Sequence, residues 1–183
     1  MRVWTQLLTG LALVLSVIAP MPATTLEQLT LDEMAQKSTT IVRARVTGSH
    51  SAYRGASIYT SFQLQVLENW KGQAITEVAV PGGVVSGIRQ NVSGAPALKP
   101  GQEYVLFLWT SPSGLTQVIG LSQGVFKLSE EGSGGGSGAA VALRPAASEL
   151  MLDRSGLPVE DRPVSIQLQD LRARVLRALG AAK

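Results

Sequence analysis

The chain has 183 residues, 16 of them basic and 13 acidic, so its formal net charge is +3 at pH 7. This even balance does not favour a nucleic-acid partner, because phosphate-binding proteins usually carry a clustered basic face. The sequence contains no cysteine, which excludes disulfides, so stability must come from packing alone. The length suits one domain with its own hydrophobic core.

The first 23 residues have the three parts of a secretory signal peptide. Arg2 provides the positive start, Leu7 to Ala19 is almost entirely apolar, and Pro20-Met21-Pro22-Ala23 supplies a helix break and a small residue for cleavage. An uncleaved membrane anchor is the alternative, but the apolar run is shorter than the roughly 18 to 20 residues that a spanning helix needs. We therefore predict residues 1–23 as a signal peptide cleaved after Ala23, a secreted or periplasmic location, and no integral membrane span after cleavage.

A short helix and two strands are expected next. The helix is predicted over Thr25 to Lys37, because Thr30 and Glu33 have the spacing of a capping box. Alternating apolar and polar residues predict one strand from Thr40 to Thr47 and a longer one that starts at Ile58 and closes on Asn69-Trp70-Lys71-Gly72. A polar bridge joins the two strands, so they are interpreted as an antiparallel hairpin of a small barrel with a polar outer face.

The middle of the chain predicts a third and a central strand. Ile75 to Val80 is the third strand, stopped by Pro81-Gly82-Gly83, after which the chain to Gly101 is a long connection. Tyr104 to Trp109 consists of six apolar residues, which indicates a central strand covered on both faces.

Two further strands are expected at Gln117 to Ile119 and Val125 to Leu128. Gly120 and Gly124 interrupt them, and such glycines favour the bulge or sharp bend that a closing barrel requires.

The C-terminal part is predicted as a loop, a brief strand and a helix. Residues 129–139 are mostly Gly and Ser and indicate a flexible loop, with a strand from Ala140 to Leu143 after it. A final amphipathic helix is expected over about residues 165–180, capped by Ser165 and ended by Gly180. The chain is thus divided into a barrel domain, residues 24–146, and a C-terminal extension, residues 147–183, whose helix either packs on the barrel or reaches for another protein.

Ser122 is the sharpest enzyme signal, because Gly120-Leu121-Ser122-Gln123-Gly124 matches the G-x-S-x-G pattern of a hydrolase nucleophile elbow. That elbow needs a helix after it and a histidine downstream, whereas here a strand is expected next and the single histidine, His50, lies upstream. We interpret the match as a barrel corner built on two glycines, with a small serine hydrolase as an alternative.

Other polar residues give no site. His50 has no Cys or carboxylate cluster near it and is expected on a surface loop rather than on a metal. The acid pairs Glu130-Glu131 and Glu160-Asp161 are expected to face solvent, although glycosidase carboxylates remain an alternative. The arginines near the C terminus are interpreted as a solvated helix face: Arg172, Arg174 and Arg177.

Tyr53 and Tyr59 could form a stacking platform for single-stranded nucleic acid or sugar. We prefer the simpler interpretation that Tyr53 covers a loop and Tyr59 pairs across strands. No catalytic, cofactor-binding or metal-binding residue is predicted, and no cofactor is expected.

Three segments together resemble a netrin-like module, the fold shared by the tissue inhibitors of metalloproteinases. They are Val42-Arg43-Ala44-Arg45-Val46, then Val66 to Gly72, then Gly101-Gln102-Glu103-Tyr104-Val105-Leu106-Phe107. The order also resembles that of uncharacterised exported bacterial proteins with a Q-G-x-F ending, here Gln123-Gly124-Val125-Phe126. The resemblance covers about residues 38 to 128. It implies a mainly β fold, a five-stranded barrel of the oligonucleotide/oligosaccharide-binding (OB) type with a short N-terminal helix and a C-terminal amphipathic helix.

The missing cysteine limits what the resemblance implies about function. The metalloproteinase inhibitors chelate the zinc of their target through an N-terminal Cys, and this chain has none, so no residue inherits that role. The leading hypothesis is an exported, non-catalytic binding domain whose partner is a protein or an envelope component. A protease-inhibitor-like module that acts through its loops, on a secreted metalloprotease, is the alternative. The sequence does not determine the oligomeric state.

Overall fold

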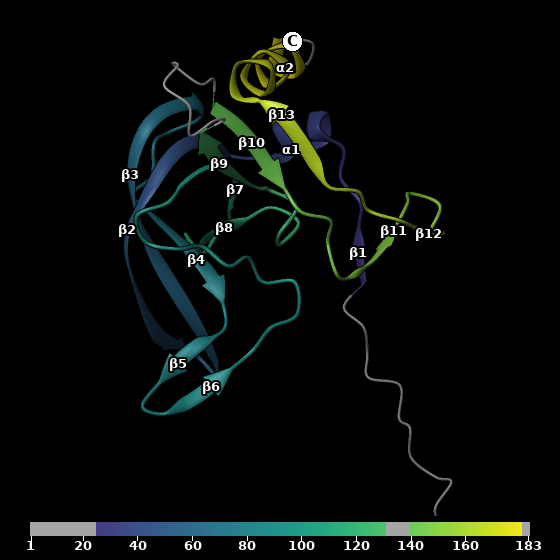
Figure 1. Cartoon of the computed structure of the whole chain (residues 1–183). Helices are drawn as coiled ribbons and strands as arrows, with labels where there is room; N and C mark the ends of the chain where they lie inside the picture. Colours follow the sequence, from purple (N-terminus) through teal and green to yellow (C-terminus); the bar gives the residue numbers. More distant parts are fainter. Residues whose placement is uncertain (1–24, 131–139, 181–183) are drawn as a thin grey trace, which may run out of the picture.

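The structure is a computed structural model that describes residues 25–130 and 140–180. Strands predominate over helices in these residues, which confirms the prediction of a mainly β protein (Figure 1). The predicted signal peptide, residues 1–23, lies outside the described residues, as does most of the predicted loop 129–139. The first two residues of that loop, Ser129 and Glu130, end a strand instead.

Helix α1 (Leu31–Lys37) is shorter than predicted, although its capping box is present. The Thr30 hydroxyl accepts a hydrogen bond from the Glu33 backbone N–H at 3.2 Å, and the Glu33 carboxylate accepts one from the Thr30 N–H at 2.9 Å. The prediction of a helix from Thr25 is wrong, because Thr25–Glu27 forms strand β1, parallel to β11 (Leu150–Leu152). The extended Thr30 cap fixes where the helix begins, and a distant strand pairs with the residues before it.

The predicted hairpin exists and extends further than its sequence pattern indicated. Strands β2 (Thr40–Arg54) and β3 (Ser57–Lys71) have 15 residues each, and their pairing continues through the segment predicted as a polar bridge. Three register shifts near the start of β2 mark bulges, which bend and twist a strand. Val42, Ala44 and Val46 are fully buried, as their alternation predicted.

One further strand pairs with each side of this hairpin. Strand β2 pairs with β7 (Glu103–Thr110), and β3 pairs with β4 (Glu77–Pro81). Strand β8 (Thr116–Val118) pairs with β7 and, through one residue pair, with β4. The central position of β7 is confirmed by the burial of Tyr104 through Leu108, except that Trp109 is 42% exposed. The predicted long connection contains a small hairpin, β5 (Gly83–Val85) and β6 (Ile88–Gln90).

The C-terminal part confirms the strands predicted at Val125 to Leu128 and at Ala140 to Leu143, and it adds β11, β12 (Pro158–Val159) and β13 (Val164–Gln167), which the sequence did not predict. Strand β10 (Ala140–Arg144) lies between β9 (Val125–Glu130) and β13 in an eight-stranded sheet. Strand β12 pairs with β11 and completes a three-stranded sheet with β1.

Ser165 is not the cap of the last helix, so that prediction is wrong. It lies in β13 opposite Leu143, and helix α2 runs from Leu168–Gly180. A serine before an apolar stripe is typical of a cap, but here pairing with β10 places the residue in a strand. Gly180 is the last residue of α2 that the structure describes, so its role as the end of the helix stays a prediction; α2 contacts α1, β3, β10 and β13 (Figure 1).

Two hydrophobic clusters hold these elements together. One lies among the strands β2, β3, β4, β7 and β8, and its buried members include Val42, Phe62, Val78, Leu106 and Val118. The other lies between the opposite side of β2 and β7 and the two helices, with Ile41, Phe107, Phe126, Leu171 and Val175. Neither helix in the described residues is long and apolar enough to cross a membrane.

Candidate functional site

A cavity of about 260 Å³ opens where the segment before β7 meets β9 and the end of β10. Most of its wall is apolar, and its polar groups are two lysines, a glutamine, a serine and a tyrosine. Ligand sites typically combine an apolar wall with a few placed polar groups in this way. We call it the lysine cavity, and it is lined by Pro96, Ala97, Lys99, Gln102, Tyr104, Ser122, Val125, Lys127, Leu143 and Pro145.

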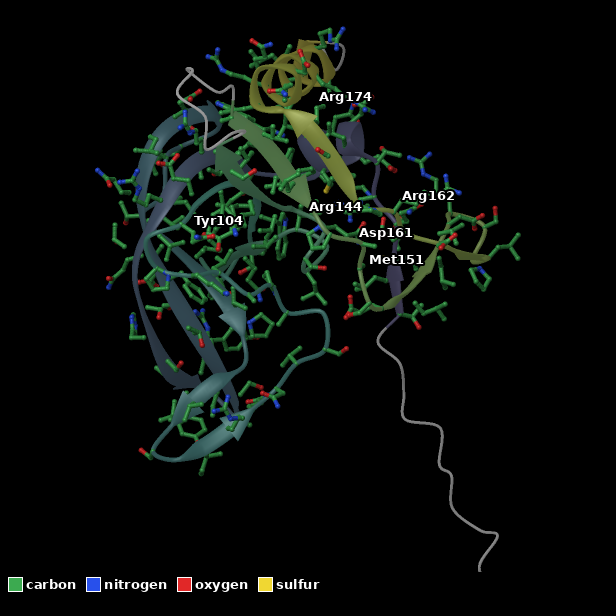
Figure 2. The ribbon with its side chains drawn as sticks, viewed as in Figure 1. Tyr104, Arg144, Met151, Asp161, Arg162 and Arg174 are labelled. Atoms are coloured by element: carbon green, nitrogen blue, oxygen red, sulfur yellow. The ribbon has the colours of Figure 1, made fainter. Side chains whose placement is uncertain are left out.

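Strand β7 and the loop before it position three polar groups of the lysine cavity, those of Lys99, Gln102 and Tyr104. Tyr104 is 3% exposed, and its hydroxyl accepts a hydrogen bond from the Lys99 backbone N–H at 3.0 Å (Figure 2). A tyrosine hydroxyl that accepts can still donate its own proton. The Oε1 atom of Gln102 is buried, and no group of the described residues bonds to it. A ligand with both a donor and an acceptor would satisfy these two groups.

Ser122 lines the lysine cavity but lies in no nucleophile elbow. The turn from Gly120 to Gly124 leads into strand β9, as predicted, whereas the elbow needs a helix at that point. A Cβ on Gly124 would lie 2.9 Å from the carbonyl oxygens of Ile119 and Phe107, so this glycine permits a close approach of two backbones. Gly120 has a φ of 60°, which glycine adopts without strain. This geometry is that of a tight corner between two strands.

His50 is an exposed residue of strand β2 rather than of a loop, so the loop prediction is wrong while the surface prediction is confirmed. It does not line the lysine cavity with Ser122. Within residues 25–130 and 140–180, no three His, Cys, Asp or Glu side chains are placed to hold a metal ion.

Asp161 is buried in an ion pair, and the prediction that it faces solvent is wrong. Its side chain is 4% exposed and accepts hydrogen bonds from Arg144 at 2.7 and 3.0 Å and from the Ala147 N–H at 2.8 Å (Figure 2). Burial raises the pKa of the Asp161 carboxyl, but these hydrogen bonds outweigh it, and the net pKa lies below its ordinary value. Glu160 is exposed as predicted, and the side chains of Glu130 and Glu131 are outside the described part.

The polar outer face of the hairpin carries a second, half-buried charge network. Arg43 donates to Glu68 on β3 and to Glu103 on β7, each at 2.9 Å, and Arg45 donates to Glu103 at 2.6 Å. The Trp70 indole N–H donates to Glu68 at 3.0 Å, and this bond most strongly lowers the pKa of the Glu68 carboxyl. Burial raises the pKa of Glu103, but hydrogen bonds from Arg45 and Arg43 outweigh this, so the net pKa lies below its ordinary value.

Two hollows of about 440 and 280 Å³ flank this charge network. The larger is lined by Glu68 and by Arg172 of α2, whose Nε lies 3.6 Å from the Glu68 carboxylate. Because these charged groups already satisfy one another, they offer a ligand less than the lysine cavity does. The helix arginines are exposed as predicted, and Arg174 pairs with Asp32 at 3.1 Å.

Lys71 and Gly72, at the end of β3, join the β2–β3 hairpin to helix α1 and to the start of β2. The Lys71 ammonium donates to the carbonyls of Ala35 and Gln36, both at 2.8 Å, at the end of α1. Burial lowers the pKa of Lys71. A Cβ on Gly72, whose φ is 69°, would lie 2.1 Å from the carbonyl oxygen of Thr39. These residues have structural roles.

Gln123 is a buried residue whose role the sequence did not indicate. It is 2% exposed, its Oε1 accepts from the Leu29 N–H at 2.8 Å, and its Nε2 donates to the Glu27 carbonyl at 3.0 Å. The side chain therefore fastens the N-terminal strand to the β8–β9 turn, beside the lysine cavity. A single polar residue in a turn gives no periodic signal in the sequence. The role of Gln123 is visible only from its hydrogen bonds to Leu29 and Glu27, which are 94 and 96 residues away in the chain.

The two tyrosines lie apart from the lysine cavity. Tyr53 is 50% exposed near the turn of the β2–β3 hairpin, and Tyr59 is half-buried opposite Ala52 and Pro81, which confirms its cross-strand pairing. No protein-family model matches this chain, and no curated protein matches it either.

Proposed function

We propose that the chain is an exported, non-catalytic binding domain that holds a segment of a protein or an envelope component in the lysine cavity. The observation that carries this proposal is the placement of Lys99 and Lys127 at an apolar wall, with the Tyr104 hydroxyl and Gln102 within it. The signal-peptide pattern of residues 1–23 supports export and a secreted or periplasmic location.

The strand pairings support an OB-like barrel related to the netrin-like modules. Pairing runs from β7 to β2, β3, β4 and β8, and β8 pairs with β7 again. The apolar side chains of these five strands form one cluster, which suits the interior of a small barrel. Fold similarity alone is a weak basis for function, so the proposal rests on the cavity.

The chemistry of the lysine cavity selects a small apolar group that ends in a carboxylate. Its volume of about 260 Å³ is slightly below the roughly 300 to 1,000 Å³ of pockets for whole small molecules. The cavity therefore suits part of a larger partner, such as the last side chain and terminal carboxylate of a peptide. The ammonium groups of Lys99 and Lys127 would balance the carboxylate charge, and Gln102 would accept a hydrogen bond from an amide N–H.

Site-specific photo-crosslinking in the producing cell tests this proposal. A benzoylphenylalanine replaces Leu143, which lines the cavity and is 37% exposed, and in a matched control replaces Leu157, which is 62% exposed elsewhere. We expect a discrete product from position 143 that weakens when Lys99→Ala and Lys127→Ala are added. The proposal fails if both positions give the same products, or if the lysine changes leave the product from position 143 intact. Unchanged circular dichroism confirms folding of each variant.

Ser122 lines the same cavity, so the serine-hydrolase alternative is tested at the same place. A fluorophosphonate label that reacts with the chain and not with Ser122→Ala would favour this alternative. The protease-inhibitor alternative is tested by adding the purified chain to the secreted metalloproteases of the same cell. Slower cleavage that survives Lys99→Ala and Lys127→Ala would favour inhibition through another surface.

A further inference from the structure

Two hairpins lie together at the end of the molecule away from α1 and α2, and their tips form one surface (Figure 1). We call it the hairpin platform: residues 52–59 of the β2–β3 hairpin and residues 83–90 of the β5–β6 hairpin. The Ile58 carbonyl accepts from the Gly82 N–H at 2.8 Å, and the Ile58 N–H donates to the Gln90 side chain at 2.6 Å. The Thr60 hydroxyl donates to the Gly82 carbonyl at 2.8 Å. These bonds hold the two hairpins as one unit.

Large apolar side chains on the hairpin platform face solvent. Tyr53 is 50% exposed, Val84 is 43% exposed and Ile88 is 59% exposed. The turn between β5 and β6 has positive φ at both Ser86 (49°) and Gly87 (80°), as in the tight turns that match the twist of a hairpin. The fold thus holds Val84 and Ile88 near a tight turn, where both side chains stay exposed.

The hairpin platform is also basic. Arg54 and Arg89 are exposed, and no carboxylate of the described residues pairs with either. The sequence has no Asp or Glu from residue 47 to 67 or from residue 78 to 98. In the charge network at the other end of the same hairpin, by contrast, Arg43 contacts two carboxylates. The platform therefore combines uncovered apolar groups with unpaired positive charge.

We propose that the hairpin platform docks the exported protein on an anionic lipid bilayer. The guanidinium groups of Arg54 and Arg89 contact lipid phosphates, the Tyr53 ring lies at the level of the headgroups, and Val84 and Ile88 enter the acyl boundary. A bilayer fits better than a folded protein, because projecting turns present isolated side chains rather than the roughly 800 Å² that each partner buries in a stable protein interface. This proposal does not depend on the lysine cavity.

Vesicle binding tests the proposal on the chain as purified after export and processing. The probes are vesicles of phosphatidylcholine alone and vesicles of equal parts of phosphatidylcholine and phosphatidylglycerol. We expect binding to the anionic vesicles and much weaker binding to the neutral ones. Each unpaired arginine near an anionic surface contributes roughly fivefold in affinity, so Arg54→Ala with Arg89→Ala should weaken binding by roughly 25-fold. Ile88→Ser should weaken it further, because an apolar group leaves the bilayer.

The matched control removes the same charge from another surface, by Arg162→Ala with Arg177→Ala, two exposed residues whose side chains make no ion pair among the described residues. It should change binding by less than about twofold, since only general attraction is lost. Equal losses for both double variants would overturn the proposal, because net charge alone would then explain binding. So would equal binding to both kinds of vesicle. Capture of an envelope protein by the platform, without vesicle binding, would assign this surface to a protein partner instead.

Discussion

The two ends of the β2–β3 hairpin have opposite chemistry, although they belong to the same pair of strands. At the end near the helices, Arg43 pairs with Glu68, and Lys71 donates to the last carbonyls of α1. At the far end, Arg54 pairs with no carboxylate of the described residues, and Tyr53 is half exposed. Charged groups near the helices thus serve the fold, whereas the Arg54 charge at the tip has no carboxylate partner among the described residues.

This difference separates residues that hold the scaffold together from residues that the fold leaves exposed. The Asn69 to Gly72 segment belongs to the scaffold: Asn69 Nδ2 donates to the Gly72 carbonyl at 2.7 Å, and Trp70 is 7% exposed. Substitutions near the helices should therefore lower stability more than matched substitutions at the tip do.

The largest contrast is expected between two glycines of the hairpin. Gly72 and Gly55 both have positive φ, 69° and 63°, so alanine strains the backbone at each. A Cβ at Gly72 would also lie 2.1 Å from the Thr39 carbonyl oxygen, whereas a Cβ at Gly55 meets nothing within 4 Å. We expect Gly72→Ala to lower the free energy of unfolding by about 3 kcal/mol or more, and Gly55→Ala by about 1 kcal/mol. Urea denaturation measures both, and equal losses would contradict the structural contrast.

Replacing one arginine at each end should give a smaller contrast. Arg43→Met leaves Glu68 and Glu103 with fewer partners in a half-buried place, so we expect a loss of about 1 to 2 kcal/mol. Arg54→Met removes an exposed, unpaired charge and should change the free energy of unfolding by less than about 0.5 kcal/mol. Urea midpoints compare the two. A loss at Arg54 as large as that at Arg43 would mean that the tip has a structural partner.

The sequence predicted elements that carry their own periodic signal. Alternation identified the start of β2, the buried run identified β7, and the spacing of Thr30 and Glu33 identified the cap of α1. Strands β1, β11, β12 and β13 have only two to four residues, too few for a period, and they exist because other strands pair with them. The far half of β2 was missed because its Gly and Ser residues are typical of a turn.

The candidate sites could not be predicted from the sequence either, because each is formed by segments that are far apart in the chain. The lysine cavity joins Lys99, Ser122 and Leu143, which lie on separate segments, and no motif links them. The pairing of Arg144 with Asp161 spans 17 residues and has no spacing that a motif could show. The platform needs β5 and β6, which the sequence indicated only as a long connection of the kind that is often functional.

The smallest expected difference between the two ends of the β2–β3 hairpin is in how stability depends on pH. Hydrogen bonds from Arg154 and from the Thr30 backbone and hydroxyl lower the pKa of Glu33 from its ordinary 4.5 to about 2, and the pKa values of Glu68 and Glu103 are also lowered. A carboxyl with a lower pKa in the folded state stabilises above its unfolded pKa, and this stability is lost as the pH falls. The urea midpoint should therefore decrease between pH 4.5 and about pH 2.

Glu33→Gln isolates this titration, because glutamine keeps the capping-box geometry but carries no charge. The variant should start about 1 kcal/mol less stable at pH 7 and lose less stability on acidification, while Arg54→Ala should follow the pH profile of the unchanged protein. If the Glu33→Gln profile runs parallel to that of the unchanged protein down to pH 2, then protonation of Glu33 does not cause the loss of stability in acid. A flattened profile for Arg54→Ala would instead show that the tip takes part in the paired charges of the fold, and the contrast between the two ends would disappear.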